Sequence, residues 1–149
     1  MSYPVLFATP GMKDFSEAVD DERQRQIKEW GDQKHPDIDP RDIDTVTQQF
    51  YAHKAEIYRE VNAERGTPSR TVSRCSRCPG DGDHQHTAWD FILLEEVFEA
   101  LAEAAAGDLD KLETELTQTA AVIAAWVYDI QRRRAAQYAA RRELEAGGD

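Results

Sequence analysis

The chain has 149 residues, of which 18 are lysine or arginine and 29 are aspartate or glutamate, so its formal net charge is −11. This length matches one ordinary domain and is sufficient to bury a core. So negative a chain repels nucleic acid and anionic membrane surfaces, and we expect neither as a partner. No apolar run approaches the ~20 residues that span a bilayer, and the first 14 residues do not have the pattern of a signal peptide. We therefore expect a cytoplasmic protein.

The first half of the chain predicts two helices. Residues 1–13 contain two prolines and a glycine and are expected to form an irregular arm. A polar-rich helix is predicted from residue 14 or 16 to Trp30, because Gly31 is a typical helix stop. A second helix is expected to begin near Asp44 and to end at Gly66.

The second half predicts two more helices after residues 67–86, the least helical segment. Thr87 can cap the first of them, with Asp90 completing a capping box. This helix is expected to end near Ala106, before Gly107. Asp108 is then expected to cap the last helix.

The centre of the last helix, residues 119–128, is apolar on nearly every side, so it must be covered by the protein's own bundle or by another subunit. The sequence thus predicts an all-α fold of about four helices. We expect a single domain over 1–149, with 67–86 as a Cys/His-containing loop insertion. The last two helices are expected to form a dimer or tetramer interface.

The segment "ILLEEVFEALAE" carries four glutamates in a helix that is otherwise apolar. At about 100° per residue, the glutamates form one stripe and the apolar residues the opposite face. One interpretation is a solvated acidic face. However, no lysine or arginine lies between Asp90 and Lys111 to form i,i+4 pairs with the stripe. The other interpretation is a bound cation that gathers the carboxylates. The stripe consists of Glu95, Glu96, Glu99 and Glu103.

The next helix carries Glu115 and Gln118 three residues apart, on one face. If the two helices pack antiparallel across their short turn, Glu96 and Glu99 can face this pair. Such oxygen ligands favour Mg²⁺ or Mn²⁺ over zinc. A ferritin-like di-iron site would need a Glu-x-x-His motif on a helix, and the chain has none.

The motif "EEVFE", followed after 15 residues by "ELTQ", resembles the signature of the MazG-like, all-α nucleoside triphosphate pyrophosphohydrolases. Their pattern is Glu-x-x-Glu on one helix and Glu-x-x-Asp on the next. The segment "ERQRQIKEWGDQKHPD" is similar to the opening of small MazG-like proteins of actinobacteria and their phages. The similar segments cover roughly residues 21–37 and 88–134. The resemblance implies a MazG-like bundle in a bacterial or phage-infected cell.

The resemblance also implies the metal ligands. Glu96 and Glu99 match the first ligand pair, and Glu115 matches the third ligand, for Mg²⁺ or Mn²⁺. Gln118 stands where the family has aspartate; its amide oxygen can bind Mg²⁺ but brings no charge and cannot act as a base. The site then holds one ion fewer, binds more weakly, borrows another carboxylate or is inactive. The carboxylates that it could borrow are Glu95 and Asp129.

The implied reaction is attack by water between the α and β phosphates of a nucleoside triphosphate, with a deoxynucleotide slightly favoured. It yields a monophosphate and pyrophosphate, in nucleotide pool cleansing or in shaping the pool of a phage host. Glu95 either orients or deprotonates this water or is a solvated neighbour. Lys111 and Lys28 either contact the β and γ phosphates or are ordinary surface lysines. Trp30 either stacks on a base whose edge Gln33 reads, or is a buried anchor at a helix end.

Residues 75–86 contain C-x2-C followed by H-x-H, a ligand set suited to tetrahedral zinc. One interpretation is a structural zinc ion that holds the loop; the other is a flexible polar loop with two free thiols. Two alternatives to an enzyme therefore stay open: a non-catalytic helical binding or regulatory protein on the same scaffold, and a zinc-stapled interaction module. The possible zinc ligands are Cys75, Cys78, His84 and His86.

Overall fold

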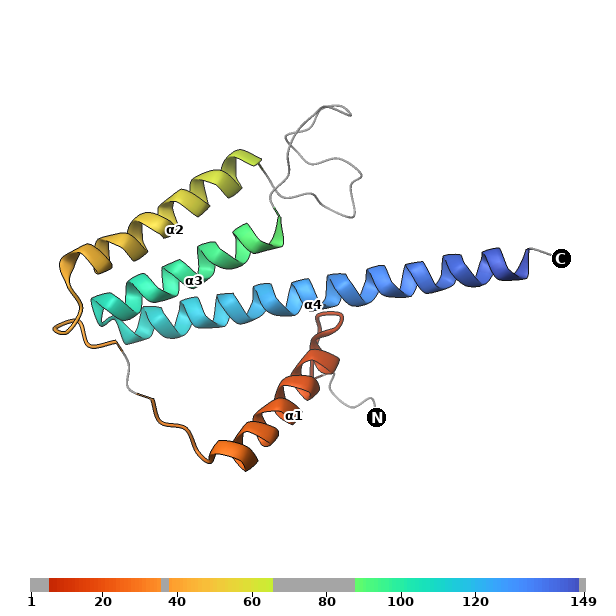
Figure 1. The fold of residues 1–149 in the computed structure, drawn as a ribbon, viewed down its shortest axis with the longest axis horizontal. Coiled ribbons are helices and arrows are strands. Elements are labelled where there is room, and N and C mark those ends of the chain that lie inside the picture. The colour runs from red at the N-terminus through yellow and green to blue at the C-terminus, as the bar shows by residue number, and fades with distance from the viewer. Residues whose placement is uncertain (1–5, 36–37, 66–87, 148–149) are drawn as a thin grey trace. The chain divides into compact units, whose positions relative to one another are not determined.

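The computed structural model describes residues 6–35, 38–65 and 88–147 (Figure 1). All of the regular secondary structure in these ranges is helical, which confirms the predicted all-α class and the four helices for this part of the chain. None of these helices is both long and apolar enough to cross a membrane. The helices are α1 (Met12–Trp30), α2 (Thr45–Arg65), α3 (Trp89–Ala106) and α4 (Leu109–Ala146).

Side-chain caps and a glycine set the helix ends around the predicted site. Asp44 caps α2, because its Oδ1 accepts a hydrogen bond from the Thr47 amide at 2.7 Å. Asp108 caps α4 in the same way, accepting from the Lys111 amide at 3.1 Å. Gly107 ends α3 in the left-handed conformation, with φ of 76°. The turn between α3 and α4 is therefore short and well defined.

Two predicted helix starts were wrong. Helix α1 begins at Met12, earlier than residue 14 or 16, because Gly11 takes the N-cap position at a φ of 80°. Helix α3 begins at Trp89, with Ala88 in the N-cap position and no side-chain cap. Asp90 accepts a hydrogen bond from the adjacent Phe91 amide at 3.0 Å. The predicted capping box also involves Thr87, which lies outside the described residues.

The chain divides into two compact units, and each is described by itself. One unit, Pro36–Val122, contains α2, α3 and the first part of α4. The other contains α1 and the rest of α4, from Ile123 onward. The prediction of a single domain over 1–149 stays a prediction.

The unit Pro36–Val122 is held together by aromatic contacts between α2 and α3. The ring of Tyr58 stacks on Phe98 with centroids 5.7 Å apart and meets Phe91 edge-on at 5.4 Å. Phe50 packs edge-on against Phe98 at 6.1 Å. These contacts fix which face of α3 looks toward α2, and they place the glutamate stripe beside it. The buried apolar residues of this unit are Ala55, Ala100, Ala104 and Ala105.

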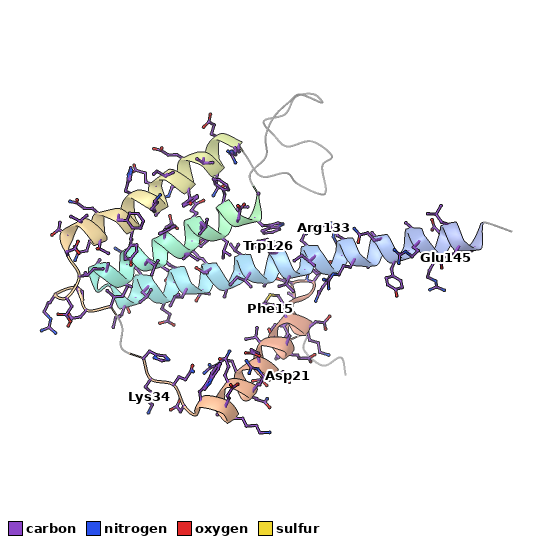
Figure 2. All side chains as sticks on the ribbon, in the orientation of Figure 1. Phe15, Asp21, Lys34, Trp126, Arg133 and Glu145 are labelled. Atoms are coloured by element: carbon purple, nitrogen blue, oxygen red, sulfur yellow. The ribbon has the colours of Figure 1, made fainter. Side chains whose placement is uncertain are left out.

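The other unit has a small core. No residue of α1 is buried, whereas Ala124 and Asp129 of α4 are. A Cβ on Gly11 would lie 2.6 Å from Cδ2 of Tyr128, so only glycine allows this close contact. Every residue from 131 to 147 is exposed, and Figure 2 shows Arg133 and Glu145 on this stretch of α4.

Candidate metal centre

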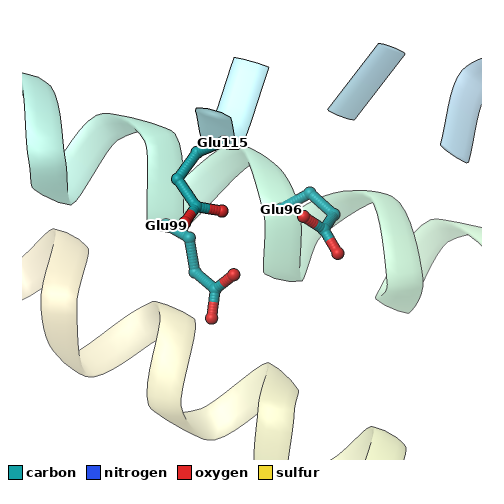
Figure 3. A group of neighbouring side chains, drawn as sticks. All are labelled: Glu96, Glu99 and Glu115. Atoms are coloured by element: carbon teal, nitrogen blue, oxygen red, sulfur yellow. The ribbon is translucent and has the colours of Figure 1, made fainter. Parts of the chain in front are cut away.

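Three glutamates from α3 and α4 lie close enough together to share one cation. Glu96 and Glu99 are one turn apart on α3, and Glu115 reaches them from α4 (Figure 3). One carboxylate oxygen from each residue lies within 4.8 Å of the other two. The predicted meeting of these three side chains across the turn therefore occurs in the structure.

The acidic stripe is not a solvated face. The side chains of Glu95 and Glu99 are only 20% and 19% exposed, and that of Glu103 is 27% exposed. Helices α2 and α4 flank α3 in this unit and restrict the access of water to the stripe. The interpretation of a solvated acidic face was therefore wrong for these side chains.

Two carboxylates of the group have buried oxygens with no hydrogen-bond partner among the described residues, Oε2 of Glu96 and Oε2 of Glu115. Burial raises the pKa of Glu96, and the charges of Glu99, Glu115 and Glu95 raise it further. Burial also raises the pKa of Glu115, aided by the charges of Glu99 and Glu103 and by a hydrogen bond with Glu99. Both carboxyls therefore hold protons more readily than a free glutamate does. A divalent cation would neutralise the same negative charge, so the carboxylates would not need to bind a proton.

Among the described residues, Arg59 of α2, which the sequence analysis missed, is the cation that pairs with this group. Its Nε and Nη2 donate to Oε1 of Glu99, the Nε bond being 3.1 Å long. The same Nε lies 3.9 Å from Oε1 of Glu95. The hydrogen bond that Arg59 donates to Glu99 is the main cause that raises the pKa of Arg59. A guanidinium thus neutralises part of the charge that α3 presents.

Asn62, one turn beyond Arg59, holds Glu95 in place. Its Nδ2 donates to Oε2 of Glu95 at 2.5 Å and to the backbone carbonyl of Phe91 at 3.1 Å. Since the carbonyl can only accept, it fixes the amide NH₂ toward α3. Glu95 is therefore a positioned carboxylate beside the three-glutamate group, as a residue that orients water would need to be. Its role as a base stays a prediction.

Lys111 has carboxylate partners near the turn. Its Nζ lies 3.1 Å from Oδ2 of Asp108 and 3.8 Å from Oε2 of Glu103. The hydrogen bond that Lys111 donates to the Asp108 carboxylate is the largest cause that raises the pKa of Lys111. The lysine side chain is 65% exposed and borders the acidic stripe through Glu103. Contact with phosphate stays a prediction.

Gln118, the fourth predicted ligand, lies on the exposed surface of α4. It borders a separate shallow hollow on α4 with Asp110, Thr114 and Thr117. Asp129, the other carboxylate considered, is buried in the other unit, with Oδ2 3.2 Å from Nε of Arg133. That Gln118 or Asp129 binds the metal ion stays a prediction.

The predicted base-binding residues belong to α1 and the segment after it. Trp30 is 55% exposed, and the guanidinium of Arg25 lies 5.7 Å from its ring centroid. The interpretation of Trp30 as a buried anchor was therefore wrong for the described chain. Lys28 and Gln33 are exposed as well. Their contact with nucleotide stays a prediction, and Cys75, Cys78, His84 and His86 lie outside the described residues.

The donor set fits a hard divalent cation. Three carboxylates offer anionic oxygens at one point, and two of these carboxylates have a buried oxygen that nothing else in the described chain binds. Mg²⁺ and Mn²⁺ prefer such ligands. Glu96, Glu99 and Glu115 are therefore the residues that would hold the ion. Comparison with models of protein families, with curated proteins and with solved structures finds no match to this chain.

Proposed function

We propose that the protein is a Mg²⁺- or Mn²⁺-dependent pyrophosphohydrolase that cleaves nucleoside triphosphates, deoxynucleotides included, to monophosphates and pyrophosphate. The observation that supports this most directly is the convergence of Glu96, Glu99 and Glu115 within 4.8 Å. The sequence resemblance to MazG-like enzymes implies metal ligands at the same three positions. A chain of net charge −11 needs such an ion to bind a polyphosphate.

The scaffold of this activity is a MazG-like four-helix bundle that forms a homodimer or homotetramer through its last two helices. Large apolar side chains on α4 support the association, because Leu109 is 60%, Leu116 53% and Ile123 39% exposed in the single chain. Isolated exposed apolar residues are common, whereas several on one helix are typical of an interface.

In the reaction, the oxygen of a water molecule bonds to the α-phosphorus, and the bond from that phosphorus to the α–β bridging oxygen breaks. A bound Mg²⁺ would neutralise charge on the phosphate oxygens and acidify the attacking water. Glu95 accepts the proton of this water, and Asn62 keeps the carboxylate in position through its 2.5 Å hydrogen bond. Pyrophosphate leaves with the electron pair of the broken bond.

The test is a substrate panel with matched variants. The purified protein is incubated with each NTP and dNTP plus Mg²⁺ or Mn²⁺, and released pyrophosphate is measured. Glu99→Gln should lower turnover by at least about 100-fold, because a ligand charge is lost. Glu113→Gln, an exposed glutamate of α4, should leave turnover unchanged. If the folded wild-type protein releases no pyrophosphate from any NTP or dNTP, the proposed pyrophosphohydrolase activity is refuted.

A second function is a non-catalytic binding or regulatory protein on the same scaffold. It is favoured by the exposure of Gln118, which stands where the resembled family has an aspartate ligand. Such a protein would bind nucleotide and metal with no turnover. Calorimetric binding of a triphosphate by a protein that fails the substrate panel would support it.

A further inference from the structure

Arg59 occupies an unusual position for an enzyme that binds an anionic substrate through a cation. Its guanidinium pairs with Glu99, which is one of the three carboxylates that would hold the metal. The arginine side chain is 56% exposed, whereas the Glu99 side chain is 19% exposed. Arg59 therefore reaches a partly buried carboxylate from the solvent side.

A metal ion and this guanidinium would compete for the same carboxylate, that of Glu99. Nε and Nη2 of Arg59 both donate to Oε1 of Glu99. A Mg²⁺ ion bound by this oxygen would lie about 2.1 Å from it and repel the neighbouring positive charge. Glu99 therefore cannot serve the ion through Oε1 and keep both hydrogen bonds.

The displaced guanidinium can move into the solvent. Because the arginine side chain is more than half exposed, it can turn away from Glu99 into solvent without a rearrangement of α2. A polyphosphate that binds the ion must approach from the open side of the carboxylate group. The planar fork of arginine binds phosphate oxygens through two parallel hydrogen bonds.

We propose that Arg59 is an exchangeable counter-ion, which pairs with Glu99 before metal binds and transfers to the polyphosphate of the metal-loaded complex. This inference rests on the proposed function, since it assigns a role within the same site. This exchange couples metal binding to substrate binding. The ion displaces Arg59 from Glu99, and the freed guanidinium then binds the polyphosphate. Arg59 is thus a substrate-binding residue as well as a restraint on the metal-free site.

The proposal predicts two effects of opposite sign in Arg59→Gln. Without its competitor, Mn²⁺ alone should bind about threefold to tenfold more tightly, because a positive charge is removed from the ligands. Inorganic tripolyphosphate, measured at saturating Mn²⁺, should bind about tenfold more weakly, because a charge-assisted fork is lost. A purely structural ion pair would not produce the second effect.

Two further variants make the experiment specific. Arg59→Lys keeps the charge but not the fork, so it should preserve the wild-type Mn²⁺ affinity better than Arg59→Gln does and still weaken tripolyphosphate binding. Arg41→Gln is the matched control, because Arg41 is an exposed arginine of the same unit that pairs with Asp39. Its Mn²⁺ and tripolyphosphate affinities should equal those of the wild type. Isothermal titration calorimetry gives both affinities, and circular dichroism verifies folding.

The outcomes separate this inference from the proposed function. Tighter Mn²⁺ and weaker tripolyphosphate binding in Arg59→Gln support the exchange even if no nucleotide is hydrolysed. Unchanged tripolyphosphate binding or weaker Mn²⁺ binding in Arg59→Gln overturns the exchange even if the wild type is an active enzyme. If the wild-type protein binds no Mn²⁺, the exchange is overturned as well.

Discussion

Replacing Glu96 by glutamine removes one negative charge from the three-carboxylate group and keeps nearly the same shape. Oε2 of Glu96 is buried and has no hydrogen-bond partner among the described residues, and its pKa is raised chiefly by burial. In the metal-free protein this charge is therefore unfavourable. We expect Glu96→Gln to stabilise the metal-free protein and to weaken its response to metal.

The magnitude follows from the distances in the cluster. Two full charges 4.8 Å apart repel by about 3.5 kcal/mol at an effective dielectric constant near 20. Glu96 has two such neighbours, Glu99 and Glu115, but partial protonation and the remaining solvent relieve most of this repulsion. We expect Glu96→Gln to raise the free energy of unfolding by about 1–2 kcal/mol, which is an increase in Tm of roughly 3–8 °C for a chain of this size.

The assay is thermal unfolding followed by circular dichroism, first with EDTA and then with increasing Mg²⁺. The wild type should gain about 2.7 kcal/mol when Mg²⁺ reaches 100 times its Kd, whereas Glu96→Gln should gain much less at the same concentration. Glu113→Gln is the control, an exposed glutamate of α4 that should behave as the wild type does.

A specific result would refute this reasoning. If Glu96→Gln melts below the wild type in EDTA and gains as much from Mg²⁺, the carboxylate is stabilised by partners other than a cation. Glu96 would then be a structural residue, and the metal would have to bind elsewhere.

The other predictions concern pH and the turn between α3 and α4. Because burial and like charges raise the pKa of Glu115, its stabilising contribution is present below 4.5, its ordinary value, and is lost as the pH rises through the folded-state pKa. Melting with EDTA should therefore show a loss of Tm above pH 4.5 that Glu115→Gln reduces; an equal loss in both proteins would contradict the assignment. The pKa of Asp108 is lowered by hydrogen bonds from Lys111, so Asp108 titrates below its ordinary value of 3.8 and outside this window. Asp108→Ala should cost about 1 kcal/mol in urea unfolding because α4 loses its cap, whereas Asp108→Asn should restore most of it. Gly107→Ala should cost about 1–2 kcal/mol, because its φ is 76° and a Cβ would lie 2.8 Å from Cγ of Pro40; a neutral effect would mean that the turn relaxes freely.

The helix ends were predictable where one residue decides them. Gly31 and Gly107 end their helices because glycine takes a positive φ at no steric cost, and Asp44 and Asp108 begin theirs because an aspartate oxygen accepts an amide proton. The start of α3 was not predictable from its cap signal. Ala88 has no side chain able to cap, so the capping pattern in the sequence indicated the wrong residue.

The glutamates of the candidate site were predictable from helical spacing, but their surroundings were not. Arg59 and Asn62 contact α3 over sequence separations of 40 and 33 residues, and in the sequence they look like ordinary polar residues of a surface helix. One signal was available. Residues 91 to 110 contain no lysine or arginine, which indicates that the positive charge that neutralises the glutamates comes from another helix. On α2, Arg59 and Asn62 are one turn apart and so lie on the same face.

The tight turn at Gly107 and Asp108 also affects the order in which the protein folds. All three carboxylates belong to one helical hairpin whose closing loop is very short, so they meet at low entropic cost. The pairing with α2 spans a far longer stretch of chain and should form more slowly. When the full-length chain refolds, the three carboxylates should therefore meet before Arg59 pairs with Glu99, so divalent ions present during refolding should speed folding.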